Sequence, residues 1–275
     1  MKYFNDLWKS FDGLDLFVNN WQPETQPKAI INFVHGLGSH SGRIKEYAMK
    51  FVDAGYAVLT FDLRGHGMSE GKTGYAKSYD FIMKDIDKLI ANSEKIYPGI
   101  PKIIYGHSLG GNFVLNYVLT HNFDCKGAIV SSPWLRLEMQ PSKIKIFTAR
   151  LLAALFPSLV MPTGLNPHFL SHDIEKVNEY INDPLIHYRL NLKLYNEICE
   201  KGDWILNNSD KLSMPLLLMH GNADKITSHK ATEEFAAKSK KLTKLKIWDD
   251  KFHELHNEIN KDEVFEYILN WIDQL

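Results

Sequence analysis

The sequence has few cysteines, no surplus of charge of either sign and no basic block. Its two cysteines, Cys125 and Cys199, lie far apart and form no C-x-x-C pair, which indicates a reduced, cytoplasmic protein without a disulfide framework. The 32 basic residues almost balance the 33 acidic ones, leaving a formal net charge of −1. Because phosphate binding needs clustered Lys and Arg, this balance argues against nucleic acid as a partner.

Long hydrophobic runs are also missing from the 275 residues. The most apolar stretch, residues 144–165, is interrupted by Lys145, Arg150, Pro157 and Pro162, so it is unsuited to spanning a bilayer. The N-terminal residues alternate polar and aromatic side chains, unlike a signal peptide. No low-complexity segment or internal repeat is present. We therefore expect a soluble globular protein that builds its core without disulfides or metal.

Short apolar runs alternate with helical patterns in two parts of the chain. Strands are expected at 29–34, 56–61, 103–105, 127–131, 215–219 and 245–248, and helices at 43–54, 78–97, 111–120, 232–240 and 261–272. A hairpin is expected around Asp12-Gly13. This alternation predicts an α/β fold, with a mostly parallel twisted sheet covered by helices on both faces.

The residues between the two alternating parts show no clear strand and read as mostly helical, with several prolines. We expect residues 132–212 to form a helical cap inserted over the carboxyl ends of the strands, where open α/β sheets bind ligands. The core domain would then consist of residues 1–131 and 213–275.

The strongest chemical signal is the G-x-S-x-G segment at 106–110, GHSLG. It follows an expected strand and precedes an expected helix, the setting in which glycines permit a sharp turn that lifts a serine hydroxyl clear of the sheet. The helix N-terminus behind Ser108 offers free N–H groups to a developing oxyanion. Ser108 is therefore the predicted nucleophile.

A serine nucleophile needs a base, and the base needs an orienting carboxylate. Asp224 follows the expected strand 215–219 and is the candidate acid, while His253 follows strand 245–248 in the chain order Ser, Asp, His. His256, three residues further on, is the rival base. Most other histidines have simpler interpretations: His35 and His220 precede glycines at strand ends, His107 belongs to the serine turn, and His40, His121 and His229 read as loop or helix-surface residues.

Two backbone N–H groups are expected to bind the oxyanion. One is that of Leu109, directly after the serine, and the other is that of Leu37 in the Gly-rich turn after the first central strand.

Three other patterns in the sequence do not carry their usual chemistry. The segment GMSEGKT at 67–73 is one residue short of a phosphate-binding loop, and HELH at 253–256 lacks the second histidine of a zinc-protease H-E-x-x-H, since position 257 is Asn. The glycines at 36 and 38 lack the third glycine of a dinucleotide site. We expect no cofactor and no metal.

Six segments taken together resemble a known family: HGLGSHSGR (35–43), DLRGHGMSEG (62–71), GHSLGGNF (106–113), NDPL (182–185), HGNADKIT (220–227) and HELHNE (253–258). They are similar to the monoacylglycerol lipase and lysophospholipase branch of the α/β-hydrolases, the serine aminopeptidase S33-like hydrolases. The match runs in order from about residue 10 to residue 272.

This resemblance implies Ser108 as nucleophile, Asp224 as acid and His253 as base, with Leu37 and Leu109 as oxyanion donors. It also implies that Arg43, Tyr180 and His256 lie near the glycerol end of the substrate. The mammalian monoacylglycerol lipases carry Glu where this chain has Ser39, so polar contacts at that end are expected to differ.

The expected function is hydrolysis of monoacylglycerol to fatty acid and glycerol. A lysophospholipase or a broad short-chain carboxylesterase would use the same residues, and a non-catalytic ligand-binding protein of this fold is a minor alternative. An apolar segment of the expected cap supports a lipid substrate, because it could line an acyl tunnel or contact a membrane surface, with Lys143, Lys145 and Arg150 near head groups. The alternative is that this segment forms an ordinary buried helix. Its apolar residues are Ile144, Phe147, Leu151, Leu152, Leu155, Phe156, Leu159 and Val160. No obligate protein partner is expected.

Overall fold

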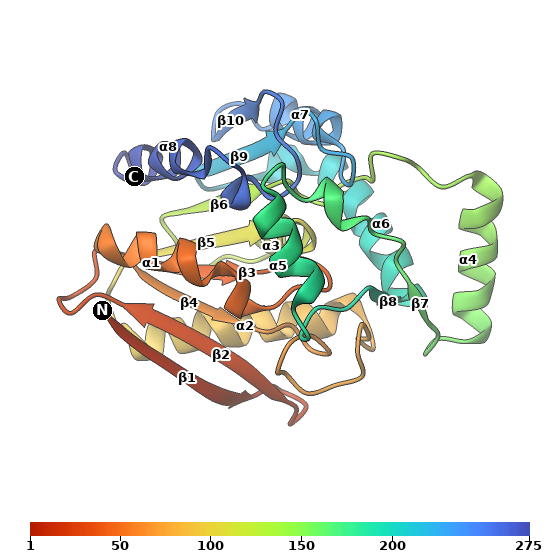
Figure 1. The fold of residues 1–275 in the computed structure, drawn as a ribbon, viewed down its shortest axis with the longest axis horizontal. Coiled ribbons are helices and arrows are strands. Elements are labelled where there is room, and N and C mark those ends of the chain that lie inside the picture. The colour runs from red at the N-terminus through yellow and green to blue at the C-terminus, as the bar shows by residue number, and fades with distance from the viewer.

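The computed structural model describes the backbone of residues 1–275 and every side chain except that of Lys143. The described backbone forms an eight-stranded sheet in the order β1-β2-β4-β3-β5-β6-β9-β10, with a separate pair of short strands (Figure 1). Strand β2 pairs antiparallel with β1 and β4, and all other neighbours in the large sheet are parallel. The strands are β1 (Lys2–Lys9), β2 (Asp15–Gln22), β3 (Ile30–Val34), β4 (Ala57–Phe61), β5 (Lys102–His107), β6 (Gly127–Ser131), β7 (Val160–Pro162), β8 (Arg189–Asn191), β9 (Leu216–Gly221) and β10 (Thr243–Trp248).

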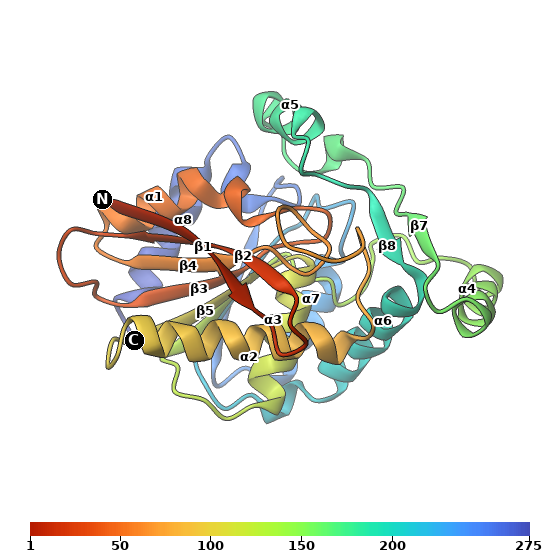
Figure 2. The same cartoon turned by 90° about the horizontal axis from the view of Figure 1, so that it is seen from below.

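Helices cover both faces of the large sheet and enclose two apolar cores. Helices α1 and α8 pack on one face, and α2, α3, α6 and α7 pack on the other (Figure 2). Strands β3, β4, β5, β6 and β9 are buried along their whole length, as expected for parallel strands covered on both sides. The helices are α1 (Lys45–Asp53), α2 (Tyr79–Ile96), α3 (Leu109–Thr120), α4 (Lys143–Leu155), α5 (Ile174–Asn182), α6 (Leu192–Asn207), α7 (His229–Lys238) and α8 (Lys261–Ile272).

The segment between β6 and β9 contains α4, α5 and α6, and α4 lies at the outer edge of the molecule (Figure 1). The expectation that this segment has no strand was wrong. Strands β7 and β8 form a two-stranded antiparallel sheet in which Val160 pairs with Asn191 and Pro162 pairs with Arg189. Each strand is only three residues long and its partner is distant in sequence, so no local sequence pattern predicts either strand.

The register of the large sheet brings the carboxyl ends of four neighbouring parallel strands to one edge. His107 at the end of β5 pairs with Ser131 of β6, which pairs with Met219 of β9. Met219 in turn pairs with Lys246 of β10. Loops that follow β3, β5, β9 and β10 therefore meet at the same edge, beneath the segment 132–212.

Candidate active site

Ser108 occupies a strained turn between β5 and α3. Its backbone angles are φ 56° and ψ −117°, a left-handed region that L-residues with side chains rarely adopt and that often marks a functional constraint. Gly106 and Gly110 make this turn possible, because a Cβ on Gly106 would collide with the carbonyl of Gly110, and a Cβ on Gly110 would collide with the carbonyl of Val34. The G-x-S-x-G spacing thus follows from close backbone contact.

Ser108, His253 and Asp224 form one chain of hydrogen bonds. The Ser108 hydroxyl donates to Nε2 of His253 over 2.8 Å. The Nδ1–H of His253 donates to Oδ2 of Asp224 over 2.7 Å. All three side chains are buried, so water competes little with these bonds. The structure therefore brings together the three residues predicted as nucleophile, base and acid.

Asp224 accepts hydrogen bonds from donors on several sides. Its Oδ2 accepts from the Thr227 hydroxyl (2.9 Å) and from Nε2–H of His220 (3.0 Å). Its Oδ1 accepts from the backbone N–H groups of Ile226 (2.7 Å) and Thr227 (3.1 Å). Burial alone would raise the pKa of this carboxyl, but His253 and the bond from His220 outweigh burial and hold the pKa well below its usual value. Asp224 is therefore ionised and fixes the tautomer of His253.

Ser132 supports this arrangement from the loop after β6. Its hydroxyl donates to the backbone carbonyl of His253 over 2.7 Å, and its own carbonyl lies 3.1 Å from the Thr227 hydroxyl, whose single proton it shares with Asp224. The backbone of Ser132 also has a positive φ, 46°. Sequence reasoning did not find Thr227, His220 or Ser132 as site residues. Their only local signal is position, since all three follow or end strands at the same sheet edge as Ser108.

The two predicted oxyanion donors lie on loops that flank Ser108. Leu109 is the first residue of α3, where backbone N–H groups have no partner within the helix. Leu37 follows β3, and its neighbour Gly36 is so close to the nucleophile that a Cβ there would lie 3.1 Å from Cβ of Ser108. Both leucines lie near the serine hydroxyl, although their binding of an oxyanion stays a prediction.

Three other histidines near the site are buried and neutral. Burial lowers the pKa of His256 to about 4, although Glu254 opposes the shift, and it also lowers the pKa of His107. The ring of His256 packs against His107 and Tyr47 rather than reaching Ser108. His35 accepts from the Leu63 N–H over 2.9 Å, and burial lowers its pKa to about 4. These histidines belong to the wall behind the triad.

His40 was expected to be a loop or helix-surface residue, and it lies in a loop but not at the surface. It is buried, and its Nε2 lies 2.8 Å from Oδ2 of Asp183, in the segment between α5 and β8. The sequence could not show this contact because it joins residues 143 positions apart.

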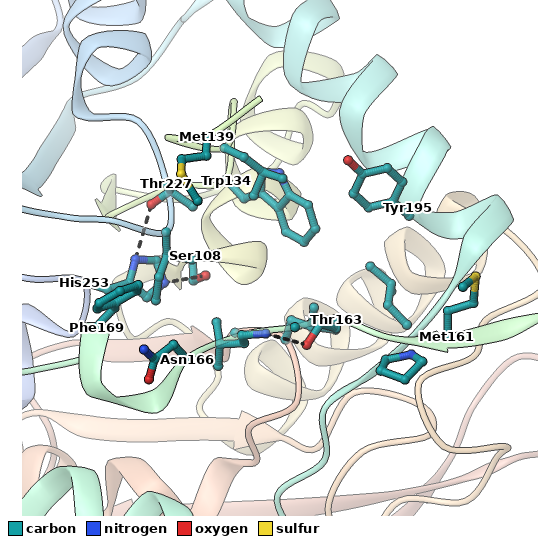
Figure 3. Close-up of a pocket in the computed structure, with 18 of the residues that line it drawn as sticks. Ser108, Trp134, Met139, Met161, Thr163, Asn166, Phe169, Tyr195, Thr227 and His253 are labelled. Carbon is teal, nitrogen blue, oxygen red and sulfur yellow. Dashed lines mark hydrogen bonds between the residues drawn. The ribbon is translucent and has the colours of Figure 1, made fainter. Parts of the chain in front are cut away.

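A cavity of about 550 Å³ opens above Ser108 (Figure 3). Residues of the sheet domain form its floor, and apolar side chains from the segment 132–212 form most of its walls. The wall residues include Trp134, Leu137, Met139, Leu152, Met161, Leu165, Phe169, Leu170, Leu190, Leu192 and Tyr195. A cavity lined mainly by apolar side chains, with polar ones such as Lys145, Asn166 and Lys225 among them, is typical of a site for an apolar ligand.

The three residues that the resemblance places near the glycerol end occupy different positions. Tyr180 lines the cavity, and its ring lies 4.5 Å from the guanidinium carbon of Arg43. Arg43 and His256 do not belong to the lining. Arg43 instead donates to Oε2 of Glu254 over 2.8 Å, and Glu254 does line the cavity. Direct contact of Arg43 or His256 with a substrate stays a prediction.

Among the described side chains, no group of three or more His, Cys, Asp or Glu residues is placed to hold a metal ion. No helix in the described residues combines the length and apolar character needed to cross a bilayer.

Comparison with known proteins agrees with this geometry. Residues 25–260 match the family described as serine aminopeptidase, S33. The chain is 30% identical to the monoglyceride lipase of Homo sapiens, over 96% of this chain and 88% of that protein. It is 35% identical to an uncharacterized abhydrolase domain-containing protein of Dictyostelium discoideum, over 96% of this chain but only 28% of that longer protein.

A solved structure extends the similarity to the fold. The crystal structure of the monoacylglycerol lipase of Paleococcus ferrophilus has a TM-score of 0.85 and 30% sequence identity, covering 93% of this chain and 97% of that one. This chain therefore belongs to the serine aminopeptidase S33 family, in the monoacylglycerol lipase branch of the α/β-hydrolases, and is a carboxylic ester hydrolase.

Proposed function

We propose that this protein hydrolyses monoacylglycerol to a fatty acid and glycerol. The observation that carries the proposal is the hydrogen-bonded chain Ser108–His253–Asp224 at the floor of an apolar cavity of about 550 Å³. The names of the human and Paleococcus ferrophilus relatives, monoglyceride lipase and monoacylglycerol lipase, support the same substrate.

In this mechanism His253 transfers the proton in both directions. Its Nε2 takes the Ser108 proton as Oγ attacks the ester carbonyl, and the N–H groups of Leu37 and Leu109 bind the oxyanion. His253 then gives the proton to the leaving glycerol oxygen, which leaves an acyl-enzyme. A water molecule, activated by the same imidazole, hydrolyses the acyl-enzyme and restores Ser108. Asp224 stays ionised and stabilises the imidazolium that forms twice in the cycle.

We further propose that residues 132–212 act as a cap on a core of residues 1–131 and 213–275. The cap carries exposed apolar side chains on α4, among them Ile144 and Phe147, and Lys145 and Arg150 lie on the same helix. Apolar side chains beside basic ones suit transient contact with a membrane surface that holds the lipid substrate. The side chain of Lys143, also expected near head groups, lies outside the described residues.

The test is release of fatty acid from 1-oleoylglycerol, assayed beside lysophosphatidylcholine, dioleoylglycerol, trioleoylglycerol and p-nitrophenyl butyrate. We expect turnover of the monoglyceride and of the small ester. Ser108→Ala, which removes only one oxygen, should lower both activities at least ~1000-fold without changing the fold as measured by circular dichroism. Cleavage of p-nitrophenyl butyrate alone would keep the serine chemistry but contradict the lipid substrate.

A further inference from the structure

Glu254 is a buried carboxylate in the cavity wall that the mechanism above does not use. It follows His253 directly and is 5% exposed, yet it lines the cavity. Its Oε2 accepts from Arg43 (2.8 Å) and from the side-chain amide of Asn257 (2.6 Å). None of the described donors reaches the other oxygen, Oε1. A buried carboxylate with one oxygen held and one available is able to accept a further hydrogen bond.

The surroundings keep this carboxylate ionised and its charge balanced. Burial alone would raise the pKa of Glu254, but Arg43, His256 and the bond from Asn257 together outweigh burial and lower the pKa below its usual value. Arg43 is itself buried and lies over the ring of Tyr180, another lining residue. The pair therefore presents to the cavity an acceptor oxygen and no net charge.

We propose that Glu254 is the residue that selects the head group of the substrate. Its Oε1 accepts a hydrogen bond from a free hydroxyl of the glycerol, and its pairing with Arg43 excludes phosphate-bearing lipids. This inference rests on the proposed function, since it assigns the polar end of the same cavity. Ser39, which also lines the cavity, has a hydroxyl able to serve the same polyol.

The preference for a glycerol head group over a phosphate follows from the charge of each group and from its ability to donate a hydrogen bond. A glycerol hydroxyl donates a hydrogen bond, and a charged acceptor makes that bond stronger than a neutral one. A phosphate monoester at the same position carries about −1.5 to −2 charge at pH 7 and acts mainly as an acceptor, and it meets a carboxylate at close range. Arg43 cannot compensate, because Glu254 already neutralises it, and a buried charge without a partner is costly. The site thus favours neutral polyol esters over anionic ones.

The experiment compares three oleoyl esters that differ only in the head group: 1-oleoylglycerol, methyl oleate and 1-oleoyl lysophosphatidate. All three release oleate and are presented at equal mole fraction in the same neutral detergent micelles. The two readouts are ratios of kcat/KM, 1-oleoylglycerol over methyl oleate and 1-oleoylglycerol over lysophosphatidate. A change in His253 alters kcat/KM for all three esters by the same factor, so it cancels in these two ratios.

Glu254→Gln keeps the size of the side chain but leaves the charge of Arg43 uncompensated. We expect both ratios to fall roughly tenfold or more, since a hydrogen bond to a charged group is lost and a phosphate now meets free Arg43. In the double variant Arg43→Gln/Glu254→Gln, lysophosphatidate turnover should drop again while the preference over methyl oleate stays lost. Glu254→Asp, which keeps the charge, should reduce only the preference for 1-oleoylglycerol over methyl oleate. This variant replaces Glu254→Gln in the test if Glu254→Gln does not fold.

The matched control is Glu258→Gln. Glu258 is an equally buried carboxylate four residues away that accepts from the Phe252 N–H (2.8 Å) and Nδ1 of His172 (3.0 Å) and does not line the cavity. Both ratios should stay at the wild-type values in this variant.

The experiment distinguishes failure of the proposed function from failure of the proposed role of Glu254. If wild-type protein cleaves p-nitrophenyl butyrate but not 1-oleoylglycerol, the proposed function is wrong. If wild-type protein prefers 1-oleoylglycerol and Glu254→Gln leaves both ratios unchanged, the function stands and the role of Glu254 is overturned. A uniform fall for all three esters with a shifted pH–rate profile would also overturn it, because Glu254 would then act through His253.

Discussion

The floor of the cavity and the outer helix of the segment above it are built in opposite ways. On the floor, the polar atoms of Asp224 and His253 are held by partners from several loops, and every side chain of the triad is buried. Helix α4 packs against α6 at the edge of the molecule and leaves Ile144 and Phe147 77% and 68% exposed (Figure 1).

The difference indicates that the two regions have different roles, proton transfer on the floor and uptake of the lipid at α4. Proton transfer requires atoms held within a few tenths of an ångström, which a fully bonded network supplies. Taking up a lipid requires an apolar surface that can contact its source, and an exposed helix supplies that surface. Changes on the floor should therefore affect kcat for every ester, whereas changes at the exposed α4 residues Ile144 and Phe147, which do not line the cavity, should affect only esters delivered from a membrane.

The largest effect should come from Asp224→Asn. An amide in place of the carboxylate favours the wrong tautomer of His253 and no longer stabilises the imidazolium, so we expect kcat to fall about 10⁴-fold with 1-oleoylglycerol and p-nitrophenyl butyrate alike. Steady-state kinetics check this. Asp249→Asn, in an exposed loop nearby, is the control and should retain wild-type kcat; a loss below tenfold for Asp224→Asn would contradict the role of Asp224.

Acid should destabilise the protein through two buried histidines of the sheet domain, His35 and His256. The folded pKa values of His35 and His256 are about 4, below the ordinary value of 6.5, because burial disfavours the charged ring. The unfolded chain therefore binds more protons between pH 6.5 and pH 4, and the free energy of unfolding falls as pH decreases through that window. We expect a loss of about 1.4 kcal/mol per histidine per pH unit.

Urea unfolding at pH 7, 6 and 5 measures this dependence, followed by tryptophan fluorescence. His35→Gln removes one of the two groups and should make the dependence shallower, whatever its effect at pH 7. An unfolding free energy that stays constant from pH 7 to pH 5 would show that these rings are not kept neutral.

A smaller effect is expected from Thr227→Val, which keeps the shape of the side chain and removes its hydroxyl. Asp224 then loses one donor, and the carbonyl of Ser132 loses its bond. We expect kcat to fall about tenfold with KM unchanged, the cost of one hydrogen bond to a charged group. Thr232→Val, which contacts only the far side of His220, is the control and should have a smaller effect; equal losses would mean that Thr227 acts through packing alone.

The smallest effect, and the only selective one, is expected on α4. Phe147→Ser should lower activity on 1-oleoylglycerol in phospholipid vesicles about threefold, because one exposed aromatic ring no longer enters the lipid surface. Activity on dissolved p-nitrophenyl butyrate should not change. Phe4→Ser removes a comparably exposed ring from β1, far from the cap, and should affect neither activity; a loss on both substrates for Phe147→Ser would contradict the separation of the two regions.

Much of the sheet domain could be predicted from the sequence because its signals are local. Each buried parallel strand is a short apolar run, and the residues that follow such runs meet at one sheet edge. Ser108, Asp224 and His253 were found in this way. The residues around Asp224 were missed, since nothing in the sequence shows that Thr227 turns its hydroxyl toward that carboxylate.

The cap and its contacts were less predictable for a physical reason. Strands β7 and β8 are three residues each, and their pairing depends on a long-range approach that periodicity does not record. The same holds for His40, buried against Asp183, and for Arg43, which pairs with Glu254 from 211 positions away. Roles that depend on such contacts, including those of Arg43 and His256 at the head group, stay predictions.

The pairing of β6 with β9 has a consequence for synthesis of the chain. These strands are neighbours in the sheet, but residues 132–215 lie between them. A ribosome adding about 5–20 residues per second needs roughly 4–17 s to make that stretch. During this time the apolar edge of β6 has no partner, and Ser108 has neither its acid nor its base. The nascent chain is therefore prone to aggregation until β9 emerges, and it stays inactive until the later segment carrying His253 has also been made.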